Sequence, residues 1–199
     1  AKVVGEATPE KTEGGFGRAA TTIENSPEGG TGGKALKIVK PVGAEVWAGA
    51  TILSLPSSQR ITNGTHKTVT FNYFSPKADS PVRVELVPYP RALGKTVTVP
   101  QGWSRVVVDF TDVPTWSASE NYVSLAIFPD FNISAGNAAQ SYFVDDVAIN
   151  GGTTPALPGA GGGGSGPFAT STVITFETGD PLGAKAVGES TAQKLEGSF

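Results

Sequence analysis

Hydrophobic and polar residues alternate along most of the chain in short runs, each bounded by Gly, Pro, Asn or Asp. This period of two is typical of β-strands with one buried face, and the 3.6-residue period of an amphipathic helix is almost absent. The pattern predicts strands at residues 34–40, 46–52, 67–74, 82–89, 95–99, 104–110, 122–128, 141–149 and 172–177. We therefore expect an all-β fold, an antiparallel β-sandwich.

The alternation also assigns faces within the strands at 67–74 and 82–89. The apolar face of each strand should belong to the core, and it consists of Val69, Phe71, Tyr73, Val82, Val84 and Leu86. The opposite faces carry side chains that could together line a concave groove: Asn72, Phe74, Arg83 and Glu85.

A Gly-, Pro- and Ser-rich segment at residues 151–172 interrupts the strand pattern, with the sequence GGTTPALPGAGGGGSGPFATST. Such a composition is typical of a flexible linker. We therefore expect one module at residues 1–150, a linker at 151–172, and the first strand and start of a next module at 173–199.

The last sixteen residues, AKAVGESTAQKLEGSF, repeat the first sixteen, AKVVGEATPEKTEGGF, with ten identical positions at an offset of 183 residues. Self-similarity at a fixed offset indicates a tandem-repeat protein. In the second copy the residues VITFETGDPLG precede the repeat. We therefore expect the module at 1–150 to lack its own first strand, with an equivalent strand displaced to the C-terminal end of the chain. A circularly permuted or engineered single module is the alternative interpretation.

The displaced strand at 172–177, TVITFE, is hydrophobic and β-branched, so it should pair with an open sheet edge of residues 1–150. Such pairing would be strand complementation. The linker is long enough for the strand to reach its own module or that of a neighbouring chain, and both arrangements are open at this point. In either case Phe176 should be buried against residues 1–150.

Composition narrows the class of protein. The chain has 199 residues, 38% of them hydrophobic and 17% charged, which is typical of a globular protein. A net charge of −3 gives no reason to expect nucleic acid as a partner, and no apolar run is long enough for membrane insertion. The chain has no Cys, which excludes disulfides and thiol nucleophiles, and no Met, which suits a fragment or a mature product. Abundant Gly, Pro, Thr and Ser with few charges indicate an extracellular location.

Several segments together resemble carbohydrate-binding modules of the family 4/9/22 type. They are ITFETGD, SPEGGTGGKALKIVK, TVTFNYFSP followed by VRVEL, TVTVPQGWSRVVVDF and SYFVDDVAI. The resemblance covers most of residues 18–150 and residues 173–183. It implies a galactose-binding-like β-jelly roll. It also implies a non-catalytic module, of a kind often found in tandem in secreted polysaccharide-degrading or surface proteins.

The resemblance further implies a structural calcium ion where the first and last strands meet, and calcium takes about six to eight oxygen ligands. By the family pattern the ligands would be the side chains of Glu177 and Asp145, helped by Glu24 and by carbonyl groups near Gly29 and Lys34. Because Glu177 belongs to the next copy, the site needs the strand at 172–177 to dock. The alternative is that these acids are solvated or hydrogen-bonded turn residues.

Asp145 and Asp146 follow one another in the predicted strand at 141–149. Successive side chains of a strand point to opposite faces, so only one of the two is expected to bind the metal ion.

A sugar-binding site needs aromatic rings, because the C–H faces of sugars stack on rings while their hydroxyls pair with polar side chains. The aromatic candidates are Trp47, Tyr89, Trp103, Trp116, Phe128 and Phe131. With the groove face added, we expect the ligand-binding residues to be Trp47, Asn72, Phe74, Arg83, Glu85, Trp116 and Phe131. The alternative is that these aromatics are core residues, as most aromatics of all-β domains are.

No motif supports catalysis, so we do not expect an enzyme. The one histidine, His66, lies in the turn-like sequence NGTHKT, and no G-x-S-x-G motif is present. The acidic residues cluster in turns rather than along one strand face, where paired carboxylates would have to lie.

The sequence therefore predicts a non-catalytic carbohydrate-binding module of a secreted or cell-surface multimodular repeat protein. Its partners would be a polysaccharide and neighbouring repeats. The alternative is a structural repeat that builds an extracellular fibre, sheath or adhesin stalk through strand complementation between successive modules.

Overall fold

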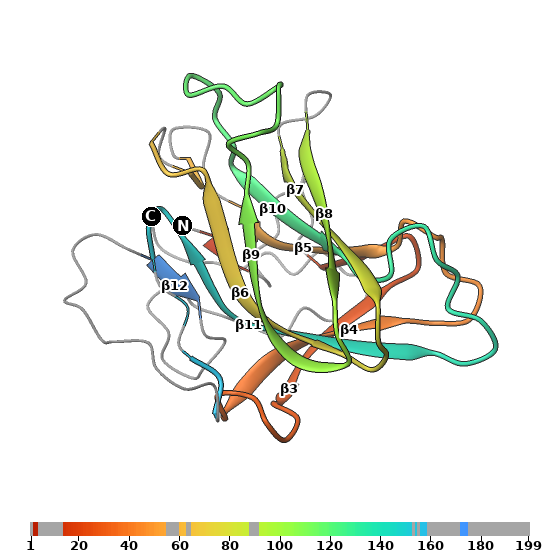
Figure 1. The fold of residues 1–199 in the computed structure, drawn as a ribbon. Helices are drawn as coiled ribbons and strands as arrows, with labels where there is room; N and C mark the ends of the chain where they lie inside the picture. Colours follow the sequence, from red (N-terminus) through yellow and green to blue (C-terminus); the bar gives the residue numbers. More distant parts are fainter. Residues whose placement is uncertain are drawn as a thin grey trace.

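The computed structural model describes residues 2–3, 14–54, 60–62, 65–87, 92–152, 154, 156–158 and 172–174. Every regular element within these ranges is a β-strand (Figure 1). The strands are β1 (Lys2–Val3), β2 (Gly14–Phe16), β3 (Ala20–Asn25), β4 (Lys34–Lys40), β5 (Gly49–Ser54), β6 (Thr68–Ser75), β7 (Ser80–Val87), β8 (Leu93–Val99), β9 (Gly102–Asp109), β10 (Ser124–Phe128), β11 (Gln140–Ile149) and β12 (Thr172–Ile174).

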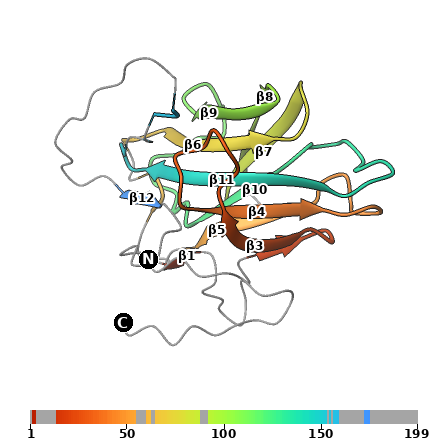
Figure 2. The same cartoon turned by 90° about the horizontal axis from the view of Figure 1, so that it is seen from below.

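The strands form two antiparallel sheets that lie one over the other (Figure 2). The first, here the β5 sheet, has the order β1-β5-β10-β7-β8, with β2 also paired to β5. The second, here the β11 sheet, has the order β3-β4-β11-β6-β9, with β12 also paired to β11. The all-β antiparallel sandwich expected from the sequence is confirmed.

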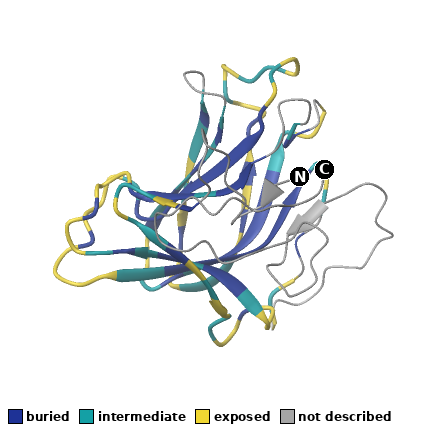
Figure 3. Ribbon diagram, turned by 180° about the vertical axis from the view of Figure 1, so that it is seen from behind, coloured by how far each residue is buried: buried dark blue, intermediate teal, exposed yellow. Residues whose placement is uncertain are grey.

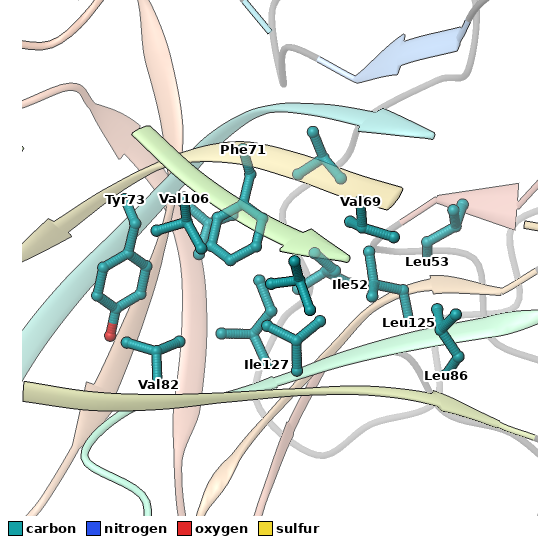
Figure 4. Packing of buried hydrophobic residues seen from close by; sticks show 14 of the residues in the cluster. Ile52, Leu53, Val69, Phe71, Tyr73, Val82, Leu86, Val106, Leu125 and Ile127 are labelled. Carbon is teal, nitrogen blue, oxygen red and sulfur yellow. The ribbon is translucent and has the colours of Figure 1, made fainter. Parts of the chain in front are cut away.

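The core lies between the sheets, where side chains of β6 and β9 face those of β5, β7 and β10 (Figure 4). All six residues predicted for the core from strand parity have no exposed surface. Burying a large apolar side chain contributes roughly 1.5–3 kcal/mol, so this layer is the main source of stability. Exposed residues are concentrated in the turns at the two ends of the strands (Figure 3).

The predicted strand at 46–52 is too long at its start. Residues 46–48 belong to a turn, closed by the Ala48 amide donating to the Glu45 carbonyl at 2.9 Å, and β5 begins only at Gly49. The sequence pattern also missed β3, whose burial is weak because it is an edge strand in which Thr21 alone is buried. In both places the alternation of hydrophobic and polar residues does not predict where the strand lies.

The expectation that Asn72, Phe74, Arg83 and Glu85 line one groove is wrong. Asn72 and Phe74 lie on β6 in the β11 sheet, whereas Arg83 and Glu85 lie on β7 in the β5 sheet. The connection at 76–79 carries the chain from one sheet to the other, so the outward faces of β6 and β7 point away from each other. Parity gave the correct face of each strand but not its sheet.

The strand β12 lies beside β11, with Thr172, Val173 and Ile174 opposite Ile149, Ala148 and Val147 of the same chain. Within the described residues, this pairing involves 172–174. Phe176 and Glu177, on which two of the sequence-based expectations depend, lie outside the described residues. Within the described ranges there is no helix with the length and apolar character needed to span a membrane.

Candidate functional site

Four aromatic side chains form a continuous row at one end of the β5 sheet, on its outer face. The Phe16 ring stacks on Trp47, with centroids 6.3 Å apart, and meets Phe128 edge-on at 5.1 Å. Phe128 in turn meets Phe131 edge-on at 5.8 Å. We call Phe16, Trp47, Phe128 and Phe131 the aromatic row.

Strand parity and register place these rings together. Leu125 and Ile127 of β10 point into the core, which leaves Phe128 on the outer face. Phe16 of β2 lies opposite Gly49 of β5, and a Cβ added to Gly49 would be 3.1 Å from the Phe16 ring. Because glycine has no side chain, the Phe16 and Phe128 rings can approach each other over it.

The end of the row at Trp47 is open to solvent. Trp47 is 47% exposed, although one edge of its indole packs against the backbone of Gly17. Val46 beside it and Ile133 in the loop after β10 are also exposed apolar side chains. Exposed apolar side chains that lie together in this way often mark a site where a ligand or a partner binds.

A charged pair lies at the other end of the row. Arg83 Nε donates to Glu85 Oε1 at 2.6 Å, and the guanidinium carbon lies 5.1 Å from the centroid of the Phe131 ring. Arg83 extends across the sheet over Gly94 of β8, where a Cβ would clash with its guanidinium. Hydrogen-bond donors and acceptors are thereby held next to an aromatic ring on an accessible face.

The structure brings together Trp47, Phe131, Arg83 and Glu85 of the ligand-binding residues expected from the sequence. Phe16 was not among the expected residues. Its identity in the two copies of the repeat, where it is one of ten identical positions, could have indicated it. Its short strand, GGF, shows no alternation, so the pattern gave no reason to place it on the sheet.

The other three expected residues lie elsewhere. Asn72 is fully buried, and its Nδ2 donates to Asp146 Oδ2 at 2.8 Å. Phe74 packs edge-on against Trp103 and Phe143 on the outer face of the β11 sheet. Trp116 stacks on Tyr122, with centroids 5.2 Å apart, and packs against the core. None of the three belongs to the aromatic row: Asn72 is buried, Phe74 lies on the other sheet, and Trp116 packs against the core.

A second polar cluster lies on the outer face of the β11 sheet, where two buried carboxylates meet one hydroxyl. Thr31 Oγ1 lies 3.2 Å from Asp145 Oδ2 and 2.8 Å from Asp146 Oδ2. The loop that carries Thr31 is held on the sheet by Trp103, whose Nε1 donates to the Pro27 carbonyl at 3.2 Å.

The expectation that Asp145 and Asp146 point apart is wrong. The pairing of β11 with β6 shifts register between Asp145 and Ala148, and Asp146 has a φ of 51°. A bulge of this kind interrupts the alternation of a strand and re-aims a side chain. Both carboxylates therefore reach the same hydroxyl.

Glu24 does not join this cluster. It is exposed on β3, where it forms an ion pair with Lys37 at 3.2 Å and accepts a hydrogen bond from Thr22 at 2.9 Å. The Thr22 hydrogen bond, with the Lys37 charge, lowers the pKa of its carboxyl. In the described part of the chain, no group of three or more His, Cys, Asp and Glu side chains is arranged to hold a metal ion. Glu177 lies outside that part.

A polar cavity of about 450 Å³ lies beside the start of β6. Its lining consists of Thr65, His66, Lys67, Thr68, Thr70, Thr111, Gly151 and Gly152. His66 is exposed there, as its turn-like sequence suggested, and its ring packs against Gly151.

No family model matches the sequence, and no curated protein matches it. Among solved structures, the family 11 carbohydrate-binding module of the cellulosomal cellulase Lic26A-Cel5E of Clostridium thermocellum is 13% identical, with a TM-score of 0.45 over 74% of this chain and 92% of that one. The C-terminal family 22 carbohydrate-binding module of Clostridium thermocellum Xyn10B is 15% identical, with a TM-score of 0.41 over 75% and 90%.

The glycoside hydrolase domain of Endo-D from Streptococcus pneumoniae R6 is 14% identical, with a TM-score of 0.43 over 67% of this chain. The match spans only 20% of that longer chain. All three TM-scores are below 0.5, so these likenesses do not identify a function for this chain.

Proposed function

We propose that the outer face of the β5 sheet binds a polysaccharide chain. The observation that carries this proposal is the aromatic row, which is open to solvent at Trp47 and ends beside the Arg83–Glu85 pair. The C–H faces of sugars stack on rings of this kind. A charged pair beside the rings can donate hydrogen bonds to sugar hydroxyls and accept hydrogen bonds from them. The family resemblance of the sequence motifs points to the same class of ligand.

The proposed role is binding without turnover. The charged side chains beside the aromatic row are Arg83 and Glu85, which form an ion pair with each other. Such a module would hold a partner enzyme or a cell surface on its polysaccharide, which is consistent with the extracellular location expected from composition.

Binding is tested by affinity electrophoresis and calorimetry of the full chain with soluble glucans, xylans and mannans. We expect Trp47→Ala to weaken binding of the preferred polysaccharide about tenfold or more, because it removes the most exposed ring of the aromatic row, and large aromatic side chains often dominate binding energy. Val107→Ala is the matched control, since Val107 is an exposed apolar residue on the other sheet. Equal affinities for the native chain and Trp47→Ala, or no binding to any of the polysaccharides, would contradict the proposal.

We also propose that calcium binds at Thr31, Asp145 and Asp146. These residues supply two carboxylates and one hydroxyl in close contact, which suits a hard cation with oxygen ligands. The ion would have a structural role, holding the loop that carries Thr31 against β11. Further oxygen ligands would have to complete the shell, and Glu177 remains our candidate for one of them.

A second candidate function is assembly with neighbouring repeats through strand complementation. The observation that favours it is the pairing of β12 with residues 147–149 of β11, across the Gly-rich segment. A strand that follows a long connection can pair with its own chain or with an identical site on another chain.

A further inference from the structure

Lys40, the last residue of β4, has a side chain with no exposed surface. Its Nζ donates to three backbone carbonyls, those of Val46 at 2.9 Å, Pro129 at 3.2 Å and Asp130 at 3.0 Å. An ammonium group has three N–H donors, and a buried one is tolerated only when they are used. All three donors of Lys40 have a carbonyl partner.

The carbonyls bound by Lys40 belong to the two segments that carry the two ends of the aromatic row. Val46 comes directly before Trp47, and Asp130 comes directly before Phe131. The two segments also contact each other, since the Asn132 amide donates to the Val46 carbonyl at 3.0 Å. The ammonium group of Lys40 therefore links the two segments through hydrogen bonds to both.

The carboxylate of Asp130 fixes the second of these segments. It is fully buried, accepts hydrogen bonds from Ser80 at 2.6 Å and Tyr142 at 2.5 Å, and forms an ion pair with Lys77. Asp130 and Asn132 both have positive φ angles, of 45° and 64°, a region that is uncommon for non-glycine residues. Contacts from β7 and β11 thus maintain the backbone on either side of Phe131.

We infer that Lys40 and Asp130 are positioning residues for the carbohydrate-binding face, and that they set the spacing between Trp47 and Phe131. This inference rests on the proposed function. The aromatic rings contact one another by packing, whereas the three hydrogen bonds of one buried ammonium group restrict where the backbone carbonyls of both segments can lie. Burial lowers the pKa of Lys40, and the charge of Asp130 opposes that shift and favours the ammonium form.

The test is Lys40→Met in the full chain. Methionine keeps most of the volume but cannot donate, so three buried carbonyls lose a partner. Lys95→Met is the matched control, because the Lys95 ammonium also donates to a backbone carbonyl, that of Asp109 at 2.8 Å, but at an exposed site away from the row. Both variants are compared with the native chain at 25 °C, where each must be shown to be folded.

Two measurements are made on these variants. Hydrogen–deuterium exchange should be about tenfold faster in residues 41–48 and 129–133 of Lys40→Met, with residues 68–75 unchanged. Affinity is measured for a soluble mixed-linkage β-glucan and for a soluble xylan. For the polysaccharide that the native chain binds, the affinity of Lys40→Met should be about tenfold lower. Lys95→Met should match the native chain in both measurements.

The outcomes separate the inference from the proposed function. Unchanged exchange in the two segments, or a lower melting temperature with unchanged affinity, would overturn the positioning role. Faster exchange in a chain that binds neither polysaccharide would support positioning and contradict the proposed function.

If Lys40→Met does not fold, Ser80→Ala provides the second variant, since it removes only one hydrogen bond to Asp130. We expect it to speed exchange in residues 129–133 about threefold, and unchanged exchange there would overturn the inference.

Discussion

At the aromatic row, the missing side chain of Gly49 leaves the space in which the neighbouring rings and strands pack. It begins β5 and lies between β2 and β10, where a Cβ would be 2.4 Å from the Ile127 carbonyl oxygen and 3.1 Å from the Phe16 ring. A larger residue at this position would have to displace backbone and not merely a flexible side chain. The row therefore depends on the absence of a side chain as much as on its four rings.

We predict that Gly49→Ala destabilises the protein by about 1–3 kcal/mol, the usual cost of overpacking a close contact. The free energy of unfolding measured by denaturant titration checks this. Thr96→Ala, at an exposed position of β8 in the same sheet, should change it by less than about 0.5 kcal/mol. A Gly49→Ala variant as stable as the native chain would contradict this prediction, because it would show that β2, β5 and β10 accommodate the added methyl group without loss of stability.

At the scale of the element, the bulge in β11 decides what the second polar cluster can do. A regular strand would place Asp145 and Asp146 on opposite faces, whereas the register shift lets both reach Thr31. The backbone amide of Asp146 also donates to Asp145 Oδ1 at 2.8 Å, which fixes the first carboxylate. Two carboxylates held together in this way repel each other unless a cation or hydrogen-bond donors compensate their charge.

We predict that calcium raises the melting temperature of the full chain and that EDTA lowers it. At a calcium concentration a hundred times its dissociation constant, one site would contribute roughly 2.7 kcal/mol. Asp145→Asn should abolish the calcium-dependent difference. Asp112→Asn, which changes an exposed aspartate beside Lys95, should retain it. Equal midpoints in EDTA and in calcium would eliminate the site.

At the scale of the whole molecule, the two outer faces of the sandwich differ in character. The β5 sheet presents the aromatic row, with Trp47 open to solvent. The β11 sheet is partly covered, by the loop that carries Thr31 and by Thr154, whose hydroxyl donates to the Asp146 carbonyl at 3.0 Å. The strand β12 pairs with this same sheet. Ligand binding and assembly between repeats would thus use different sheets of the sandwich.

We predict that Val173→Pro, in the middle of β12, removes assembly of the full chain if complementation between chains occurs. Proline has no N–H to donate and is disfavoured in strands, so it should weaken the pairing of this three-residue strand with β11. Light scattering after size exclusion over a range of concentrations should show oligomers of the native chain that Val173→Pro lacks. Ala160→Pro in the Gly-rich segment is the control. A native chain that is monomeric at every concentration would rule out exchange between chains.

The sequence by itself determined the fold class and the core, because alternation with a period of two records which face of each strand meets water. It correctly placed Val69, Phe71 and Tyr73 of β6 inside, together with their counterparts on β7. It also singled out Trp47 and Phe131 as candidates for the site. Each of these conclusions depends only on local periodicity or on the chemistry of one residue type.

Only the tertiary structure decided which of these faces lie together. Sheet membership separated Asn72 and Phe74 from Arg83 and Glu85, and a bulge joined the carboxylates that parity had placed apart. The contacts of Lys40 with Val46, Pro129 and Asp130 span up to 90 residues of sequence, so no local pattern contains them. Long-range pairing is selected by the packing of the whole chain, which determines how the separate faces combine into a site.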